Sequence, residues 1–140
     1  MITVDVAAAA GLRAFPGTAV RRIVAHVCNA ERVKSGHFSF VIVNDRMMRS
    51  INKKFLGHDY VTDILTFPME EGEAVAEIYI NAKQMKRQAG ENGVTVTNEM
   101  LRLVVHGILH TLGYDDTTPK AMKEMERRQE RYVAALDRKK

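Results

Sequence analysis

Residues 97–116 have the sequence TNEMLRLVVHGILHTLGYDD, and this stretch decides the predicted fold and chemistry together. Its apolar residues recur at helical spacing and predict a buried helix through Leu112, opened by Thr97 or Asn98. Gly113 follows where a helix commonly ends in a left-handed residue, a conformation that glycine adopts without strain. We therefore expect a central helix that ends in a reversal of the chain.

Two histidines lie on this helix. His106 and His110 are four residues apart, so their imidazoles lie about 40° apart around the axis and one turn up, where both can reach one ion. The reversal at Gly113 can bring Asp116 toward the same ion. Two imidazoles and a carboxylate leave the fourth position of zinc open, as in catalytic rather than structural sites. The sequence therefore predicts a hydrolytic zinc site, although nickel and cobalt suit similar ligands.

The spacing of these ligands matches the zincin pattern that ends in a glycine turn. Peptidases of that class carry a glutamate directly after the first histidine, where it serves as general base. This chain has Gly107 at that position. We therefore predict a zincin-like metal helix whose chemistry is not proteolysis.

The rest of the chain alternates short strands with helices. Periodicity, caps and turn residues predict four strands and about five helices, which is an α+β domain. The final helix carries an apolar stripe that we expect to face the core, made of Met122, Met125, Tyr132, Val133 and Leu136. The expected strands are 1–6, 37–43, 63–67 and 75–80, with an acidic loop at 70–73. The expected helices are 18–34, preceded by a turn and cap at 15–18, then 45–55, 81–89, 97–112 and 118–137.

Composition limits the class of protein. A chain of 140 residues with 46% hydrophobic residues is expected to form one domain, residues 1–140. The lone Cys28 excludes an internal disulfide. There is no apolar run of about 18 residues and no secretory signal pattern, so we expect a cytoplasmic protein without a membrane span. The net charge of +4 lies in residues 118–140, which is typical of a solvated helix or of a segment that attracts phosphates.

Three blocks of sequence resemble the YbeY family of rRNA-maturation endoribonucleases. They are HGILHTLGYDD (106–116), NKKFLGHDYVTDILTFP (52–68) and the segment around Glu77, AEIYIN (76–81). The resemblance implies a small mixed sheet with the metal helix packed against it. It also implies metal-dependent cleavage of single-stranded RNA at the 3′ end of 16S rRNA, a part in ribosome quality control, and the small ribosomal subunit as a partner. No DNA substrate is expected.

The chain departs from the family pattern at three positions. Asp116 stands where the third ligand is ordinarily histidine, and a carboxylate is still an acceptable zinc ligand. Leu56 stands where an arginine commonly contacts substrate phosphate, and leucine cannot bind phosphate. Glu77 replaces an aspartate and keeps the carboxylate. The metal site is therefore better preserved than the phosphate-binding side.

Several residues have both a functional and a structural interpretation. His58, Asp59, Thr62 and Asp63 are expected to bind substrate, with His58 close enough to take part in catalysis; Asp and Thr are also common in turns. Glu77 is a candidate base, or an outward-facing strand residue. Asp115 is a candidate for orienting a histidine, or a cap for the next helix. Tyr114 is expected to anchor the turn rather than to stack on a base.

Two functional hypotheses remain open, and a third is weaker. The first is a zinc-dependent single-strand endoribonuclease of rRNA maturation. The second, motivated by Leu56, is a ribosome-associated binding or quality-control factor that keeps the metal but has little or no nuclease activity. The third is a small metallohydrolase that acts on a substrate other than nucleic acid.

Overall fold

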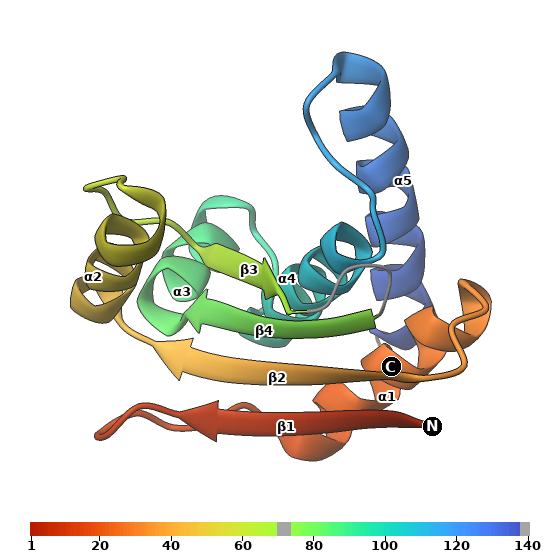
Figure 1. Cartoon of the computed structure of the whole chain (residues 1–140), viewed down its shortest axis with the longest axis horizontal. Coiled ribbons are helices and arrows are strands. Elements are labelled where there is room, and N and C mark those ends of the chain that lie inside the picture. The colour runs from red at the N-terminus through yellow and green to blue at the C-terminus, as the bar shows by residue number, and fades with distance from the viewer. Residues whose placement is uncertain (70–73, 138–140) are drawn as a thin grey trace.

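The computed structural model describes residues 1–69 and 74–137, so the acidic loop predicted at 70–73 lies outside the described residues. Four strands and five helices confirm the α+β prediction (Figure 1). In chain order they are β1 (Ile2–Ala8), α1 (Gly17–Ala30), β2 (Gly36–Val43), α2 (Asp45–Leu56), β3 (Ile64–Pro68), β4 (Ala74–Asn81), α3 (Ala82–Glu91), α4 (Val96–Thr111) and α5 (Pro119–Leu136).

The sheet is mixed, as predicted. Its strand order is β1-β2-β4-β3, with β1 parallel to β2, β2 parallel to β4, and β3 antiparallel to β4. Because β4 is inserted between β2 and β3, the short strand β3 forms one edge of the sheet beside α4. This arrangement places the segment that precedes β3 near the helix that carries the histidines.

The core lies between the sheet and helices α1, α3, α4 and α5. In Figure 1, α1, α3 and α4 lie behind the strands and α5 stands at the right. Alternate strand residues such as Phe38, Phe40, Ile78 and Ile80 are fully buried against these helices. α4 is the central helix, with α3 and α5 on either side of it. No helix within the described ranges is long and apolar enough to cross a membrane.

Some boundaries differ from the prediction because local hydrogen bonds override periodicity. α1 ends at Ala30 rather than near residue 34, since Arg32 takes a left-handed conformation (φ 61°) and the Val33 amide donates to Cys28 O. Its N-cap is Pro16, which offers no side-chain cap. α4 begins at Val96, one residue earlier than expected, because the Thr95 hydroxyl accepts from the Asn98 amide and caps the helix.

The last helix also corrects one prediction about the core. Met125, Tyr132 and Val133 are buried as expected, but Met122 is 42% exposed. It lies in the N-terminal part of α5, which projects beyond the body of the domain (Figure 1). Apolar residues therefore recur at helical spacing along the whole of α5, but only from Met125 onward does the helix pack against the core.

Candidate active site

The histidine pair lies near the C-terminal end of α4. His106 is partly buried and His110, in the last turn, is exposed. The helix is well supported, because nine of its sixteen residues are buried and hold it against the sheet and its neighbouring helices. His106 and His110 therefore lie one turn apart on a single, well-supported helix.

Gln129 of α5 fixes the orientation of His106. Its side-chain oxygen lies 2.9 Å from His106 Nδ1, and its amide nitrogen donates to Glu130 Oε2 over 3.4 Å. Because an amide oxygen can only accept, Nδ1 must carry the proton. The lone pair of His106 is therefore on Nε2, the atom that is left for a ligand.

This contact begins a chain of polar groups that crosses three helices. Arg102 donates to both oxygens of Glu130, over 2.7 and 2.8 Å, and to the buried Glu99 over 3.0 Å. Gln88 then donates to Glu99 Oε2 over 3.0 Å and to Asp63 Oδ2 over 3.2 Å. The carboxylates raise the pKa of Arg102, mainly through the hydrogen bond to Glu130. The segment that ends at Asp63 is thus tied to the helix that carries the histidines.

Gly107 lets α4 approach the sheet closely. A Cβ on this residue would lie 3.0 Å from Ile78 Cδ1 and 3.3 Å from Ile64 Cδ1, closer than ordinary van der Waals contact. The residue is buried. A side chain at this position would therefore meet Ile78 and Ile64 of the sheet.

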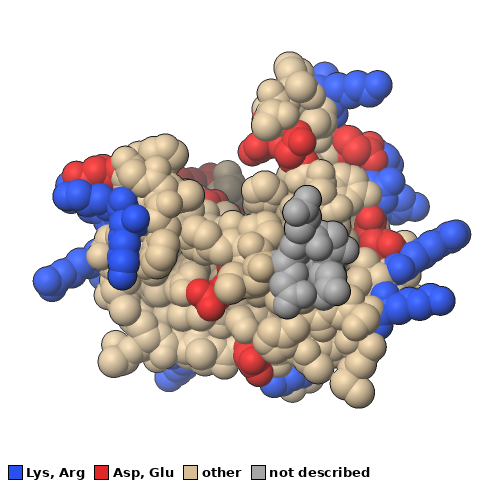
Figure 2. Space-filling model, viewed as in Figure 1, with Lys and Arg blue, Asp and Glu red and all other residues tan. Residues whose placement is uncertain are grey.

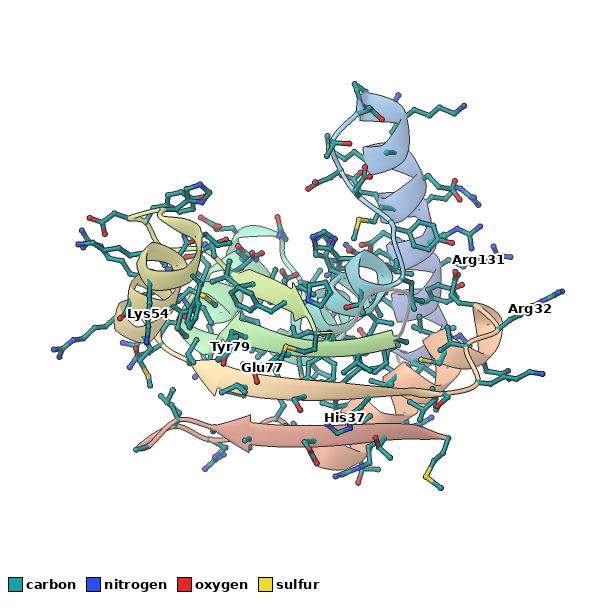
Figure 3. The ribbon with its side chains drawn as sticks, in the orientation of Figure 1. Arg32, His37, Lys54, Glu77, Tyr79 and Arg131 are labelled. Carbon is teal, nitrogen blue, oxygen red and sulfur yellow. The ribbon has the colours of Figure 1, made fainter. Side chains whose placement is uncertain are left out.

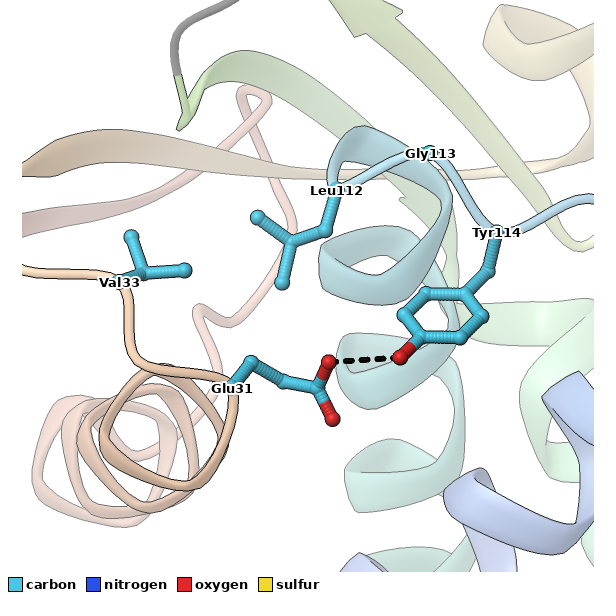
Figure 4. A pocket seen from close by; sticks show the side chains of 5 residues that line it. All are labelled: Glu31, Val33, Leu112, Gly113 and Tyr114. Atoms are coloured by element: carbon cyan, nitrogen blue, oxygen red, sulfur yellow. Dashed lines mark hydrogen bonds between the residues drawn. The ribbon is translucent and has the colours of Figure 1, made fainter.

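The chain does reverse after α4, as predicted. Gly113 has φ 105°, and the Tyr114 amide donates to Leu109 O over 3.1 Å. The Tyr114 hydroxyl donates to Glu31 over 2.7 Å beside a cavity of about 380 Å³ (Figure 4), so this tyrosine anchors the turn. Burial and the bond to Glu31 raise the pKa of Tyr114 to about 12, which keeps the hydroxyl protonated.

Glu31 is the centre of this anchor. Besides Tyr114, it accepts hydrogen bonds from Tyr132 and, over 2.8 Å, from Arg128. Burial of the carboxyl would raise its pKa, but the hydrogen bonds from the two tyrosines and the charge of Arg128 outweigh burial and lower it. α1, the turn after α4, and α5 are therefore joined at one ionised carboxylate.

The turn after Tyr114 does not complete a metal-binding group among the described residues. Asp116 is exposed, and within residues 1–69 and 74–137 no three His, Cys, Asp or Glu side chains gather into a group that could hold a metal. Asp115 accepts from the amide and hydroxyl of Thr117, and these bonds, with a smaller effect of His110, lower its pKa. Thr118 caps α5, so Asp115 is not the helix cap, and Gln129 rather than Asp115 orients His106.

The predicted substrate segment lies between α2 and β3. His58 and Tyr60 are stacked, with ring centroids 5.3 Å apart and His58 Nδ1 3.1 Å from the Tyr60 hydroxyl. Asp59 accepts from Arg49 over 2.6 Å, and this bond lowers the pKa of the carboxyl. His58 and Asp59 are exposed, while Thr62 and Asp63 are partly buried, and Leu56 is 46% exposed.

The ends of this segment are fixed by polar contacts. The buried Asn81 side chain donates to Thr62 O over 3.3 Å, and the Asn81 amide donates to Asp63 O over 2.8 Å. The Asn52 side chain donates to Tyr60 O over 3.1 Å. The segment is therefore held at its backbone, which leaves His58 and the hydroxyl of Tyr60 at the surface.

Glu77 does not share a face with the histidines. It alternates with Ile78, which packs under Gly107 of α4, so the Glu77 side chain lies on the other face of the sheet. There it accepts a hydrogen bond from Tyr79. The structure therefore gives Glu77 the outward-facing position and corrects the interpretation as a base in the cleft.

Sequence reasoning missed Gln129. The residue is only 9% exposed and lies four positions after Met125 and four before Val133, within the apolar stripe of α5. A polar residue in such a stripe indicates a buried hydrogen-bonding partner. Its partner is 23 residues away in sequence, and no local spacing identifies His106 as that partner.

Comparison with known proteins agrees with this arrangement. The family model described as Endoribonuclease YbeY matches residues 14–137. The Endoribonuclease YbeY of Chlorobium phaeovibrioides is 38% identical over 125 residues, which cover 89% of this chain and 84% of the relative. The Endoribonuclease YbeY of Chloroherpeton thalassium is 34% identical over 123 residues, which cover 87% of this chain and 87% of the relative.

A solved structure is similar as well. The solution structure of a protein from Thermotoga maritima superposes with a TM-score of 0.69 at 28% sequence identity, covering 97% of this chain and 89% of that one. Both the sequence and the fold are thus those of one family, and the chain belongs to the YbeY endoribonucleases.

Proposed function

We propose that this protein is a metal-dependent endoribonuclease that cleaves single-stranded RNA in the cytoplasm, with the 3′ end of 16S rRNA on the small ribosomal subunit as its substrate. Membership of the family supports RNA cleavage. The observation that carries the metal part is the hydrogen bond between Gln129 and His106. Partners of this kind hold metal-binding histidines in one tautomer and orientation.

The donor chemistry of the two histidines fits a zinc ion. Two histidines one helical turn apart, one of them with Nε2 left free by the contact of Nδ1 with Gln129, can supply two of the three ligands that a catalytic zinc needs. The third proposed ligand, Asp116, is exposed, and it does not form a three-residue metal-binding group with the pair within the described residues. We propose that His106, His110 and Asp116 hold the ion, with zinc favoured by the imidazole and carboxylate donors.

When bound, such an ion supplies a Lewis acid for the negative charge that develops on the phosphate. The chain itself contributes position and protons. Gln129 holds His106 in the Nδ1–H form, and the polar chain through Glu130 and Arg102 holds Gln129. Asp63 lies at the other end of this series of hydrogen bonds, where it accepts from Gln88 and fixes the segment that carries His58. We propose that His58 contacts the RNA and exchanges protons with it.

The test is cleavage of a single-stranded oligoribonucleotide by the purified protein. We expect a chelator to abolish cleavage and added zinc to restore it. The double variant His106→Ala, His110→Ala, purified in parallel, should cleave at the background rate of a mock preparation. Zinc-independent cleavage that survives in the double variant would contradict the proposal.

Leu56 supports a second candidate function, a ribosome-associated binding or quality-control factor with a mainly structural metal. The side chain is exposed and uncharged where the family resemblance predicts a phosphate contact. The variant Leu56→Arg distinguishes the two candidates. Cleavage by the natural chain supports the enzyme, whereas cleavage only by Leu56→Arg, with small-subunit binding by both proteins, supports the binding factor.

A further inference from the structure

Away from the histidine pair, three aromatic rings form a continuous cluster at one corner of the sheet. We call Phe55, Phe67 and Tyr79 the aromatic corner. Phe55 lies in the last turn of α2, Phe67 in β3 and Tyr79 in β4. The centroids of Phe55 and Phe67 are 5.7 Å apart and those of Phe67 and Tyr79 are 5.8 Å apart, both in edge-to-face geometry. Phe55 is 60% exposed, so the cluster opens to solvent at this ring.

The aromatic corner lies on the face of the sheet opposite to the core helices. Tyr79 alternates with the buried Ile78 and Ile80, and Phe67 is paired in register with Glu77. Tyr79 and Glu77 are labelled on this face in Figure 3, with α4 behind the strands. Parallel strand pairs such as β2 and β4 usually have both faces covered. An open face with aromatic rings at its corner therefore needs an explanation beyond folding.

Positive charge accompanies the rings. Lys54 Nζ lies 5.3 Å from the centroid of Phe55, and among the described residues no carboxylate lies within ion-pair distance of it. Figure 2 shows Lys and Arg atoms gathered over α2, at the left of the view. Glu77, bonded by the Tyr79 hydroxyl, lies at the other side of the rings and limits how far an anionic ligand can extend.

An exposed aromatic ring with a lysine beside it suits one ligand class better than others. Single-stranded nucleic acids bind by stacking bases on aromatic side chains while cations contact the phosphates. The bases of a double helix are not available for such stacking. Lysine is depleted at the cores of protein–protein interfaces, so a lysine over the exposed ring favours RNA over a protein partner.

We propose that the aromatic corner binds a segment of single-stranded RNA, with a base stacked on Phe55 and Lys54 contacting a neighbouring phosphate. This inference rests on the proposed endoribonuclease function and adds a contact on the other side of edge strand β3 from α4. It also gives the RNA a binding surface at Phe55, next in sequence to Leu56, where the arginine that would contact a phosphate is missing.

The chain contains no tryptophan, so a single one can report stacking at this place. In Phe55→Trp, a 12-nucleotide oligoadenylate should quench the tryptophan fluorescence, and a duplex RNA of equal length should quench it far less. The matched control is Val96→Trp, because Val96 is 44% exposed but lies at the start of α4. Equal quenching at both positions, or none in Phe55→Trp while the oligomer binds, overturns the proposal.

A second pair of variants distinguishes stacking on the aromatic ring from simple apolar contact. Fluorescence anisotropy with the same labelled oligomer should show binding about tenfold weaker for Phe55→Leu and nearly unchanged for Phe55→Tyr. If Phe55→Leu binds as tightly as the natural chain while that chain cleaves RNA, the corner has no such role and the proposed function stands. If the natural chain neither binds nor cleaves RNA, both proposals fail.

Discussion

The side-chain oxygen of Gln129 lies 2.9 Å from Nδ1 of His106, across the contact between α5 and α4. This hydrogen bond decides which imidazole nitrogen is free, because the amide oxygen forces the proton onto Nδ1. It therefore connects the packing of the last helix to the chemistry of the histidine pair, and it makes the first prediction specific.

Replacing Gln129 should weaken zinc binding more than it affects folding. We expect Gln129→Leu to lower zinc affinity about 10- to 100-fold, because the partner of His106 is lost while the volume is nearly kept. Gln129→Glu keeps an acceptor and should restore most of the affinity. The measurements are zinc competition with a chromophoric chelator and thermal unfolding without zinc. Equal affinities for both variants would show that the hydrogen bond does not position the ligand.

Two neighbouring aspartates allow a direct test of the third ligand. If Asp116 binds the ion, Asp116→Ala should lower zinc affinity at least tenfold, because one of three protein ligands is removed. Asp115→Ala removes only the bonds to Thr117 and should have a small effect. Zinc titration of both variants, with stoichiometry from metal analysis, checks this. The reverse order of affinities would assign the ligand to Asp115.

Close packing at Gly107 predicts a loss of stability on enlargement. Gly107→Val should lower the free energy of unfolding by about 1–3 kcal/mol, because the added methyl groups meet Ile78 and Ile64. Gly90→Val is the control, since Gly90 is an exposed residue of α3 and a Cβ there meets no atom within 4 Å. Urea unfolding of both variants isolates the packing effect. A similar change in both would mean that α4 can move away from the sheet.

The carboxylate of Glu31 predicts a stability difference that depends on pH. Its pKa is lowered in the fold, so its ionised form stabilises the protein above the pKa of the unfolded chain. This contribution is lost as the pH falls through the lower pKa of the folded protein. Glu31→Gln should therefore be less stable than the natural chain at pH 7, and the difference should shrink on acidification.

The measurement is urea unfolding at a series of pH values between 7 and 3. Glu126→Gln is the control, because Glu126 is exposed on the same helix as Arg128 and Tyr132, the partners of Glu31. A difference between Glu31→Gln and the natural chain that stays constant with pH would mean that packing, rather than charge, explains the effect.

Much of the fold was predictable because it depends on short-range interactions. Strand and helix types follow from the spacing of apolar residues, and caps such as Asn44 and Asn81 fix where helices begin. The two errors at helix ends arose where a nearby hydroxyl or a left-handed residue offered other hydrogen bonds, at Thr95 and Arg32. The prediction that Met122 is buried was wrong, because burial depends on whether another element packs against that part of α5.

The sequence by itself determined the histidine pair on one helix, the glycine reversal after it and the absence of a peptidase base, because these features depend on spacings of a few residues. Only the tertiary structure decided that Gln129 orients His106, that Glu31 anchors Tyr114 from 83 residues away, and that Glu77 faces away from the histidines. These contacts join segments far apart in the chain. Their partners are chosen by how helices and strands pack, and a single sequence carries no spacing that records that choice.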